Sequence, residues 1–229
     1  MRYEWQEEVA VAAQPLQPLQ PLQLITTITT HYNYYNNITT FQHYTKPMAH
    51  IELNNDLPGI RGLMAYRPEL AEPLNALAET LLRDDNNTLT RGERELIGTY
   101  VSYLNDCFFC QNVHGAMAGH YLECDIQQID AVKQDFRSAE LTDKMKALLA
   151  IAYSVQKGGK QVTEEQIAEA REHGATDTEI HDTVLIAAAF CMFNRYVDGL
   201  GTWAPQDRQF YINRAPQRAL EGYQSSVFK

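Results

Sequence analysis

Helix start and stop signals follow one another between Pro58 and Gly201, and no stretch of this region alternates apolar and polar residues as a half-buried strand does. Apolar residues recur at spacings of three and four, as at Leu70, Leu74, Leu77 and Leu81. Glycines and Asp/Asn clusters stand where these periodic segments end. We therefore expect an all-α fold, with helices over residues 68–83, 91–104, 107 to beyond 117, 125–136, 142–156, 163–173 and 176–197.

The first 47 residues differ in kind from this helical region. The triplet Pro15-Leu16-Gln17 occurs three times in tandem, and a Thr/Tyr/Asn-rich stretch follows over residues 25–40. Proline at every third position removes backbone donors, and no helical apolar stripe is present, so residues 1–47 are predicted to be a disordered leader. Met48 offers an alternative start. We expect residues 48–204 to form one compact helical domain and residues 205–229 a C-terminal tail, for which a helix or an interface role is open.

Charge and hydropathy limit the partners. The chain has 19 basic and 29 acidic side chains, a formal net charge of −10 that repels nucleic-acid phosphates and anionic membranes. Its longest apolar run, Val184 to Phe193, is shorter than the roughly 18–20 residues of a membrane-spanning helix. The acidic N-terminus does not resemble a secretory signal. We expect a cytoplasmic protein that binds small molecules or other proteins, and neither nucleic acid nor a membrane.

A Cys-x-x-Cys pair carries the strongest chemical signal. Two of the four cysteines, Cys107 and Cys110, form this pair, which in a core-capable chain without an export signal indicates a redox or metal site rather than a structural disulfide. On a helix Cys107, Cys110 and His114 share one face. His114 would lie one turn from Cys110 but about two turns, roughly 10 Å, from Cys107.

Two adjacent thiols are what a thiol peroxidase needs, because a thiolate attacks the O–O bond and a second thiol condenses with the resulting sulfenic acid. The positive end of the helix favours a thiolate on Cys107, nearest the helix start, whereas the reach of His114 favours Cys110. A base acts on the proton directly, while the dipole contributes less than about 1 kcal/mol at exposed sites. We therefore predict Cys110 as the attacking thiol and Cys107 as the resolving thiol.

Glu95 is a weaker candidate on spacing alone. It lies on the preceding predicted helix, in register with Thr99 and Ser102. If the two helices pack as a hairpin, its carboxylate can orient His114 and relay a proton. Most glutamates on helices are solvated, so the spacing by itself does not establish this role.

The arrangement Glu95, eleven residues, Cys107-Phe108-Phe109-Cys110, three residues and His114 resembles the core motif of the alkyl hydroperoxidase D (AhpD) family. The segment around it resembles the peroxidase-related branch of that family, within the carboxymuconolactone decarboxylase superfamily, from about Ile51 to Thr202. The prototype of the family has a histidine where this chain has Phe109, a departure that bears on the proton relay and on the identity of the protein reductant.

The resemblance implies an all-helical antioxidant enzyme that forms trimers or hexamers. It would reduce a small-molecule hydroperoxide through its cysteine pair, without a bound cofactor, and be re-reduced by a protein or small dithiol. By position, Cys110 matches the peroxidatic cysteine, Cys107 the resolving one, His114 the base and Glu95 the relay carboxylate.

Three other interpretations stay open on the sequence. Zinc could be bound by Cys107, Cys110 and His114, with Cys124 as a fourth ligand, although three ligands on one helix strain a tetrahedral site. A lactone decarboxylase of the same superfamily is a second, but its chemistry does not require paired thiols. A redox sensor that turns over slowly is the third, and only a turnover number separates it from a catalyst.

Overall fold

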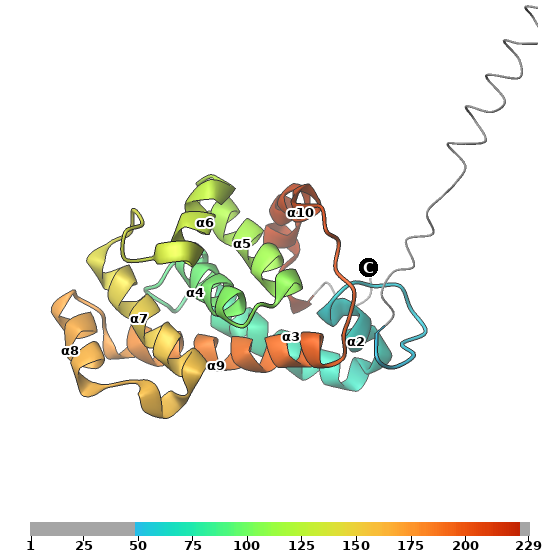
Figure 1. Ribbon diagram of the computed structural model, residues 1–229, viewed down its shortest axis with the longest axis horizontal. Coiled ribbons are helices and arrows are strands. Elements are labelled where there is room, and N and C mark those ends of the chain that lie inside the picture. Colours follow the sequence, from blue (N-terminus) through green and yellow to red (C-terminus); the bar gives the residue numbers. More distant parts are fainter. Residues whose placement is uncertain (1–48, 225–229) are drawn as a thin grey trace, which may run out of the picture. The chain divides into compact units, whose positions relative to one another are not determined.

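The computed structural model describes residues 49–224, and this part of the chain is all-α, as predicted (Figure 1). The predicted leader over residues 1–47 lies outside the described residues. The elements are α2 (Ile60–Tyr66), α3 (Pro68–Arg83), α4 (Arg91–Leu104), α5 (Phe108–Leu122), α6 (Ile126–Asp135), α7 (Asp143–Lys157), the 3₁₀ turn η1 (Gly159–Gln161), α8 (Glu164–Glu172), α9 (Asp177–Gly199) and α10 (Arg208–Glu221).

The helix boundaries expected between residues 68 and 199 are confirmed to within about two residues, because local capping chemistry sets them. At the start of α4 the Thr90 side chain accepts from the backbone N–H of Glu93, and the Glu93 carboxylate accepts from the backbone N–H of Thr90. The same reciprocal capping box opens α8 and α9. The short helix α2 and the turn η1 were not predicted.

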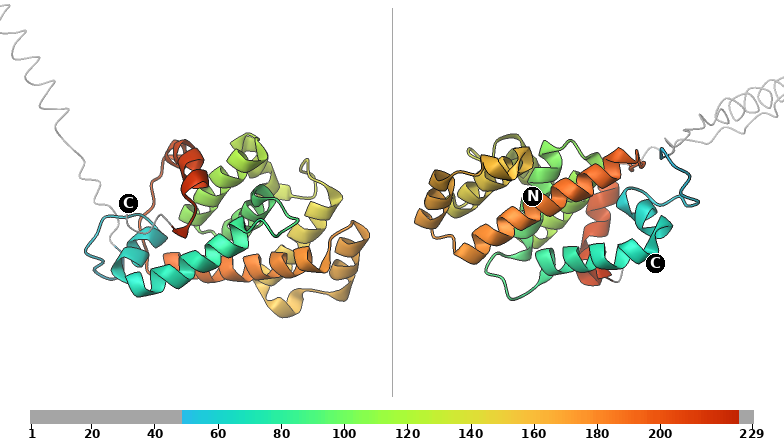
Figure 2. Two further views of the ribbon diagram at one scale, coloured as in Figure 1. Left: turned by 180° about the vertical axis from the view of Figure 1, so that it is seen from behind. Right: turned by 90° about the horizontal axis from the view of Figure 1, so that it is seen from below.

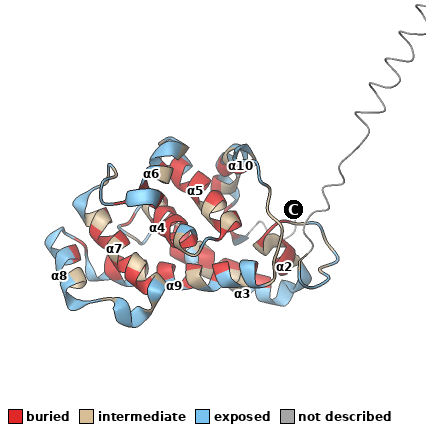
Figure 3. Ribbon diagram, in the orientation of Figure 1, coloured by how far each residue is buried: buried red, intermediate tan, exposed pale blue. Residues whose placement is uncertain are grey.

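The helix α4 lies at the centre of the packing. It contacts α5, α6, α7 and α9, and most of its residues are buried, whereas the outer faces of α6 and α8 are exposed (Figures 1 and 3). Gly98 allows α9 to approach α4 closely, since a Cβ there would stand 2.3 Å from the ring of Phe190 on α9. The close approach of α9 to α4 thus depends on a missing side chain.

The C-terminal segment returns to the domain and packs on it. Helix α10 lies against α5, as both views in Figure 2 show. Arg83 of α3 donates to the carbonyl of Ala219 at 2.6 Å, and Glu79 accepts from the backbone N–H of Tyr223 at 2.6 Å. These bonds from α3 fix the chain beyond α10 and bring Tyr223 into the interior.

No helix within residues 49–224 is long and apolar enough to cross a bilayer.

Candidate active site

A tight turn between α4 and α5 positions the cysteine pair. Asn105 ends α4, Asp106 takes a left-handed conformation with φ 56°, and Cys107 becomes the N-cap of α5. The backbone N–H of Cys107 donates to the carbonyl of Ser102 at 2.9 Å, which closes the turn. The two helices therefore run back along each other as a hairpin, with Glu95 of α4 facing His114 of α5.

Side-chain amides tie this turn to α9 and α7. The side-chain amide of Asn105 donates to Asn194 Oδ1 at 2.8 Å, and the Asn194 amide donates to Ser102 Oγ at 3.0 Å. Gln156 of α7 donates in turn to Asn105 Oδ1 at 3.0 Å. These bonds connect the turn before α5 and the end of α4 with α9 and α7, so the network fixes the turn that precedes Cys107.

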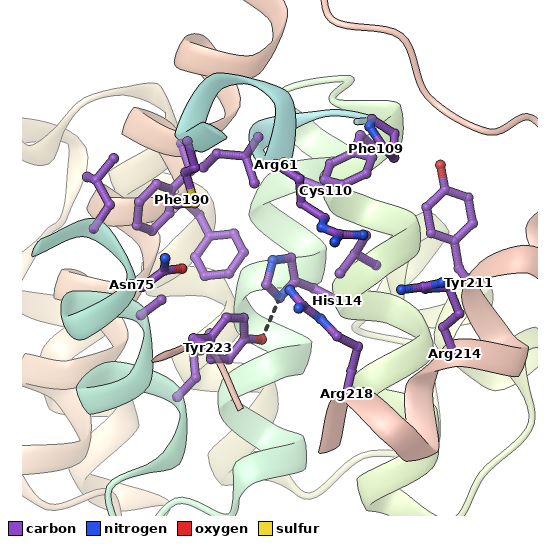
Figure 4. A pocket seen from close by; sticks show the side chains of 18 of the residues that line it. Arg61, Asn75, Phe109, Cys110, His114, Phe190, Tyr211, Arg214, Arg218 and Tyr223 are labelled. Carbon is purple, nitrogen blue, oxygen red and sulfur yellow. Dashed lines mark hydrogen bonds between the residues drawn. The ribbon is translucent and has the colours of Figure 1, made fainter. Parts of the chain in front are cut away.

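His114, Glu95 and Tyr223 are joined by hydrogen bonds, and Figure 4 shows the one between His114 and Tyr223. Glu95 is fully buried, and its Oε2 lies 2.7 Å from His114 Nδ1 while its Oε1 accepts from the Tyr223 hydroxyl at 2.6 Å. A carboxylate accepts hydrogen bonds, so we assign the ring proton to Nδ1 of His114. This leaves Nε2 of His114 with the lone pair that can take a proton.

Aromatic rings hold the imidazole on both sides. Phe190 meets it edge-on with ring centroids 4.6 Å apart, and the Tyr223 ring lies nearly parallel to it at 6.0 Å. Burial and the charge of Glu95 raise the pKa of Tyr223 well above 10, so its hydroxyl stays a neutral donor. The orientation of His114 is therefore fixed by two hydrogen-bonding partners and two rings.

The two sulfurs occupy different positions. Both cysteines are free and buried, but Cys110 lines a pocket together with His114, whereas Cys107 is fully buried and does not line it. A hydrogen bond to Cys110, together with burial, raises the pKa of the Cys107 thiol. Cys107 is the N-cap of α5 and Cys110 lies in its first turn, so the helix dipole favours a thiolate on either. Access and the imidazole distinguish them, and both favour Cys110.

The pocket over Cys110 spans about 1080 Å³, including open solvent at its mouth. Its walls come from α2, α3, α5, α9 and α10. Most of the lining is apolar, with Met64, Leu74, Leu82, Phe109, Phe190 and Phe193 among its side chains. The apolar lining suits an organic molecule rather than a small inorganic one.

A zinc site is not supported by this geometry. Among residues 49–224 no group of three or more His, Cys, Asp and Glu side chains is arranged to hold a metal ion. Cys124 follows the C-terminal end of α5 and Cys107 precedes its start, so the 15-residue helix separates them by roughly 22 Å. His114 Nδ1 is already engaged by Glu95.

The structure brings Glu95, Cys107, Cys110 and His114 together, as the spacing of the sequence suggested. Sequence reasoning missed Tyr223, because it lies 109 positions after His114 in a segment without a motif. It also missed Asn75, Arg61 and the arginines of α10, which line the same pocket. Only the helical spacing of Arg214 and Arg218, four residues apart, could have signalled a shared face.

Comparisons with known proteins agree with this architecture. Residues 68–134 and 127–204 match the carboxymuconolactone decarboxylase family. None of the curated proteins matches the chain. A solved structure from Ralstonia eutropha JMP134, an uncharacterized peroxidase-related protein with an alkylhydroperoxidase AhpD core, is 27% identical with a TM-score of 0.62, covering 88% of this chain and 98% of its own.

Two further solved structures share the fold. An uncharacterized peroxidase-related protein from Silicibacter sp. TM1040 is 25% identical with a TM-score of 0.61, over 68% of this chain and 78% of its own. A protein of unknown function from Agrobacterium tumefaciens is 22% identical with a TM-score of 0.55, over 63% of this chain and 97% of its own, and shows likeness of fold alone.

Proposed function

This chain belongs to the carboxymuconolactone decarboxylase family, and on that premise we propose that it is a thiol-dependent reductase of organic hydroperoxides. One observation carries the proposal: Cys110 and His114 line one largely apolar pocket, and the buried carboxylate of Glu95 holds Nδ1 of His114, which leaves Nε2 as the base. The peroxidase-related neighbours support the same reaction class.

The first step oxidises Cys110. His114 Nε2 takes the thiol proton, and the Cys110 thiolate attacks the terminal oxygen of the hydroperoxide. An S–O bond forms, the O–O bond breaks, and His114 returns the proton to the leaving alkoxide, so the products are Cys110 sulfenic acid and an alcohol. Glu95 stabilises the imidazolium that forms between these two proton transfers.

The second step uses Cys107. Its thiol condenses with the Cys110 sulfenic acid to give a disulfide and water, which protects Cys110 from further oxidation. Cys107 suits the resolving role, because its raised pKa keeps the thiol protonated and unreactive until the sulfenic acid has formed. A dithiol, either a small molecule or a protein, then restores both thiols by thiol–disulfide exchange.

The test is consumption of cumene hydroperoxide with dithiothreitol as donor. The wild type should turn over repeatedly, and Cys110→Ser should fall to the rate of the buffer. Cys124→Ser is the matched control, because this partly buried cysteine follows the far end of α5, and it should retain the wild-type rate. Equal rates for wild type and Cys110→Ser would overturn the proposal.

The same assay separates the alternatives. A redox sensor would form the disulfide once and then turn over slowly, whereas a lactone decarboxylase would leave the peroxide unchanged. We also expect the protein to act in the cytoplasm as a homo-oligomer, a trimer or a hexamer, which light scattering of the full chain would measure.

A further inference from the structure

The pocket over Cys110 has one charged wall. Arg61 of α2 and Arg214 and Arg218 of α10 line it, and Figure 4 shows all three side chains reaching toward the region around His114. No Asp or Glu side chain of the described residues lines this pocket. The chain as a whole has a net charge of −10, but the three guanidinium groups make the pocket beside Cys110 locally positive.

Bringing these arginines together has a cost. Burial and the charges of Arg218 and Arg214 lower the pKa of Arg61, and the charge of Glu221 offsets only part of this. Arg214 lies over the Phe210 ring at 5.3 Å and Arg218 over the Tyr223 ring at 5.8 Å, which limits where their side chains can turn. Guanidinium groups held close to one another match an anion that accepts from several of them at once.

Asn75 is an independent sign that this pocket receives a ligand. It lies on α3, is buried, and lines the same pocket, on the opposite side of His114 from Arg214 in Figure 4. Its Nδ2 has no hydrogen-bond partner among the residues that the structure describes. A buried donor without an acceptor is costly in a folded protein, and an oxygen of a bound molecule would satisfy it.

We propose that the pocket selects hydroperoxides of organic acids, whose carboxylate binds the arginines Arg61, Arg214 and Arg218. The apolar body of such a molecule would lie along Met64, Leu74, Phe190 and Phe193, with the hydroperoxide group at Cys110. The Asn75 amide donates to a second oxygen of the bound molecule. The inference rests on the proposed peroxidase function and adds the substrate class to it.

A pair of substrates that differ only in charge tests the selection. We compare kcat/KM for cumene hydroperoxide carrying a ring carboxylate with that for its methyl ester. Two charge-assisted hydrogen bonds predict a preference for the acid of about tenfold or more in the wild type. The preference should shrink toward one in Arg214→Gln and in the Arg214→Gln/Arg218→Gln double variant, and it should weaken at high ionic strength.

Arg208→Gln is the matched control on the same helix. Arg208 begins α10 and pairs with Asp130 at 2.8 Å, outside this pocket. It should keep the full preference for the acid. A loss as large as that of Arg214→Gln would mean that net charge, rather than the pocket, decides the preference, and would overturn the inference.

Binding without chemistry keeps the two proposals distinguishable. With Cys110→Ser protein, 4-isopropylbenzoate should bind about tenfold or more tightly than its methyl ester in a calorimetric titration, and Arg214→Gln should remove the difference. If the carboxylate binds but no peroxide is consumed, the peroxidase function fails while the anion site stands. If acid and ester are consumed at equal rates and bind equally, the inference is wrong and the peroxidase function stands.

Discussion

Two buried glutamates, Glu95 beside the cysteine pocket and Glu179 in the first turn of α9, have different kinds of hydrogen-bonding partner. Both are shielded from solvent, with 0% and 1% of their surface exposed. Lys144 donates to Glu179 at 2.8 Å, and the backbone N–H of Thr176 donates to it at 2.7 Å. Burial alone would raise the pKa of Glu179, but these donors outweigh it and the pKa lies below its usual value.

Glu95 has a different set of partners. Its hydrogen bonds come from His114 and Tyr223, and no lysine or arginine of the described residues pairs with it. A carboxylate fully paired with a lysine holds a helix end in place. A carboxylate whose partner is an imidazole that lines a pocket can instead stabilise that imidazole when it takes a proton from a bound group. A buried charge therefore indicates a functional site only when its partner is also taken into account.

The largest expected difference is between the two Glu→Gln variants. Glu95→Gln removes the charge that stabilises the His114 imidazolium, and it should slow peroxide reduction by about 100-fold or more. Glu179→Gln should leave that rate unchanged and cost about 1 kcal/mol of stability through the lost Lys144 pair, or about 2–4 °C in Tm. Steady-state rates and thermal melts of both variants measure this. Similar losses of rate in the two variants would contradict a role for Glu95 that Glu179 does not share.

Tyr223→Phe should have a smaller effect on rate than Glu95→Gln. The Phe variant keeps the ring beside His114 but leaves Oε1 of Glu95 without its donor at 2.6 Å. We expect a loss of about 1–3 kcal/mol in stability and a rate reduced by about tenfold. Steady-state rates and thermal melts of this variant measure both effects. A rate equal to that of the wild type would show that Tyr223 supports only the packing.

Two glycines extend the comparison to packing. Gly98→Ala would push a Cβ into the Phe190 ring at 2.3 Å, and Phe190 in turn contacts His114, so we expect a loss of about 1–3 kcal/mol and a slower enzyme. Gly159 in η1 has no atom within 4 Å of an added Cβ, and Gly159→Ala should change stability by less than about 0.5 kcal/mol. Chemical denaturation of both variants checks this. Equal stabilities would mean that the helices shift apart at no cost.

The smallest expected effect is on alkaline stability. The pKa of Tyr223 lies well above 10 in the folded protein, so above pH 10 the unfolded chain releases a proton that the folded one keeps. The stability contributed by this group therefore falls as pH rises, by less than about 1 kcal/mol at pH 10.5. Tyr223→Phe should lose less stability than the wild type between pH 9 and 10.5. Parallel pH curves would contradict the buried, neutral phenol.

Local signals account for how well the sequence predicts the fold. Thr90 with Glu93 and the glycines after α7 and α8 are short-range chemistry, which a sequence displays directly. Helix α2 is only seven residues long, with Gly59 rather than a side-chain cap before it, so it leaves little periodic signal. The helix α10 contains Pro216, and a proline inside a helix lowers the helix propensity on which a prediction from sequence depends.

The site is predictable only in part, for a related reason. Cys110 and His114 lie one turn apart on α5, so their spacing reveals a shared face, and Cys107 is the N-cap of the same helix rather than part of it. Glu95 needs the hairpin turn at Asp106 to reach His114, so its spacing made it only a weak candidate and the family resemblance strengthened it. Tyr223 needs the whole tertiary fold, because α3 anchors it from across the chain.

The most direct measurement traps the sulfenic acid after one equivalent of cumene hydroperoxide, with dimedone and mass spectrometry, in Cys107→Ser and Cys110→Ser protein. We expect a modified Cys110 in the Cys107→Ser variant and no modification of Cys107 in the Cys110→Ser variant, because of the two cysteines Cys110 alone lines the pocket beside His114. A stable sulfenate on Cys107 in the absence of Cys110 would contradict this expectation.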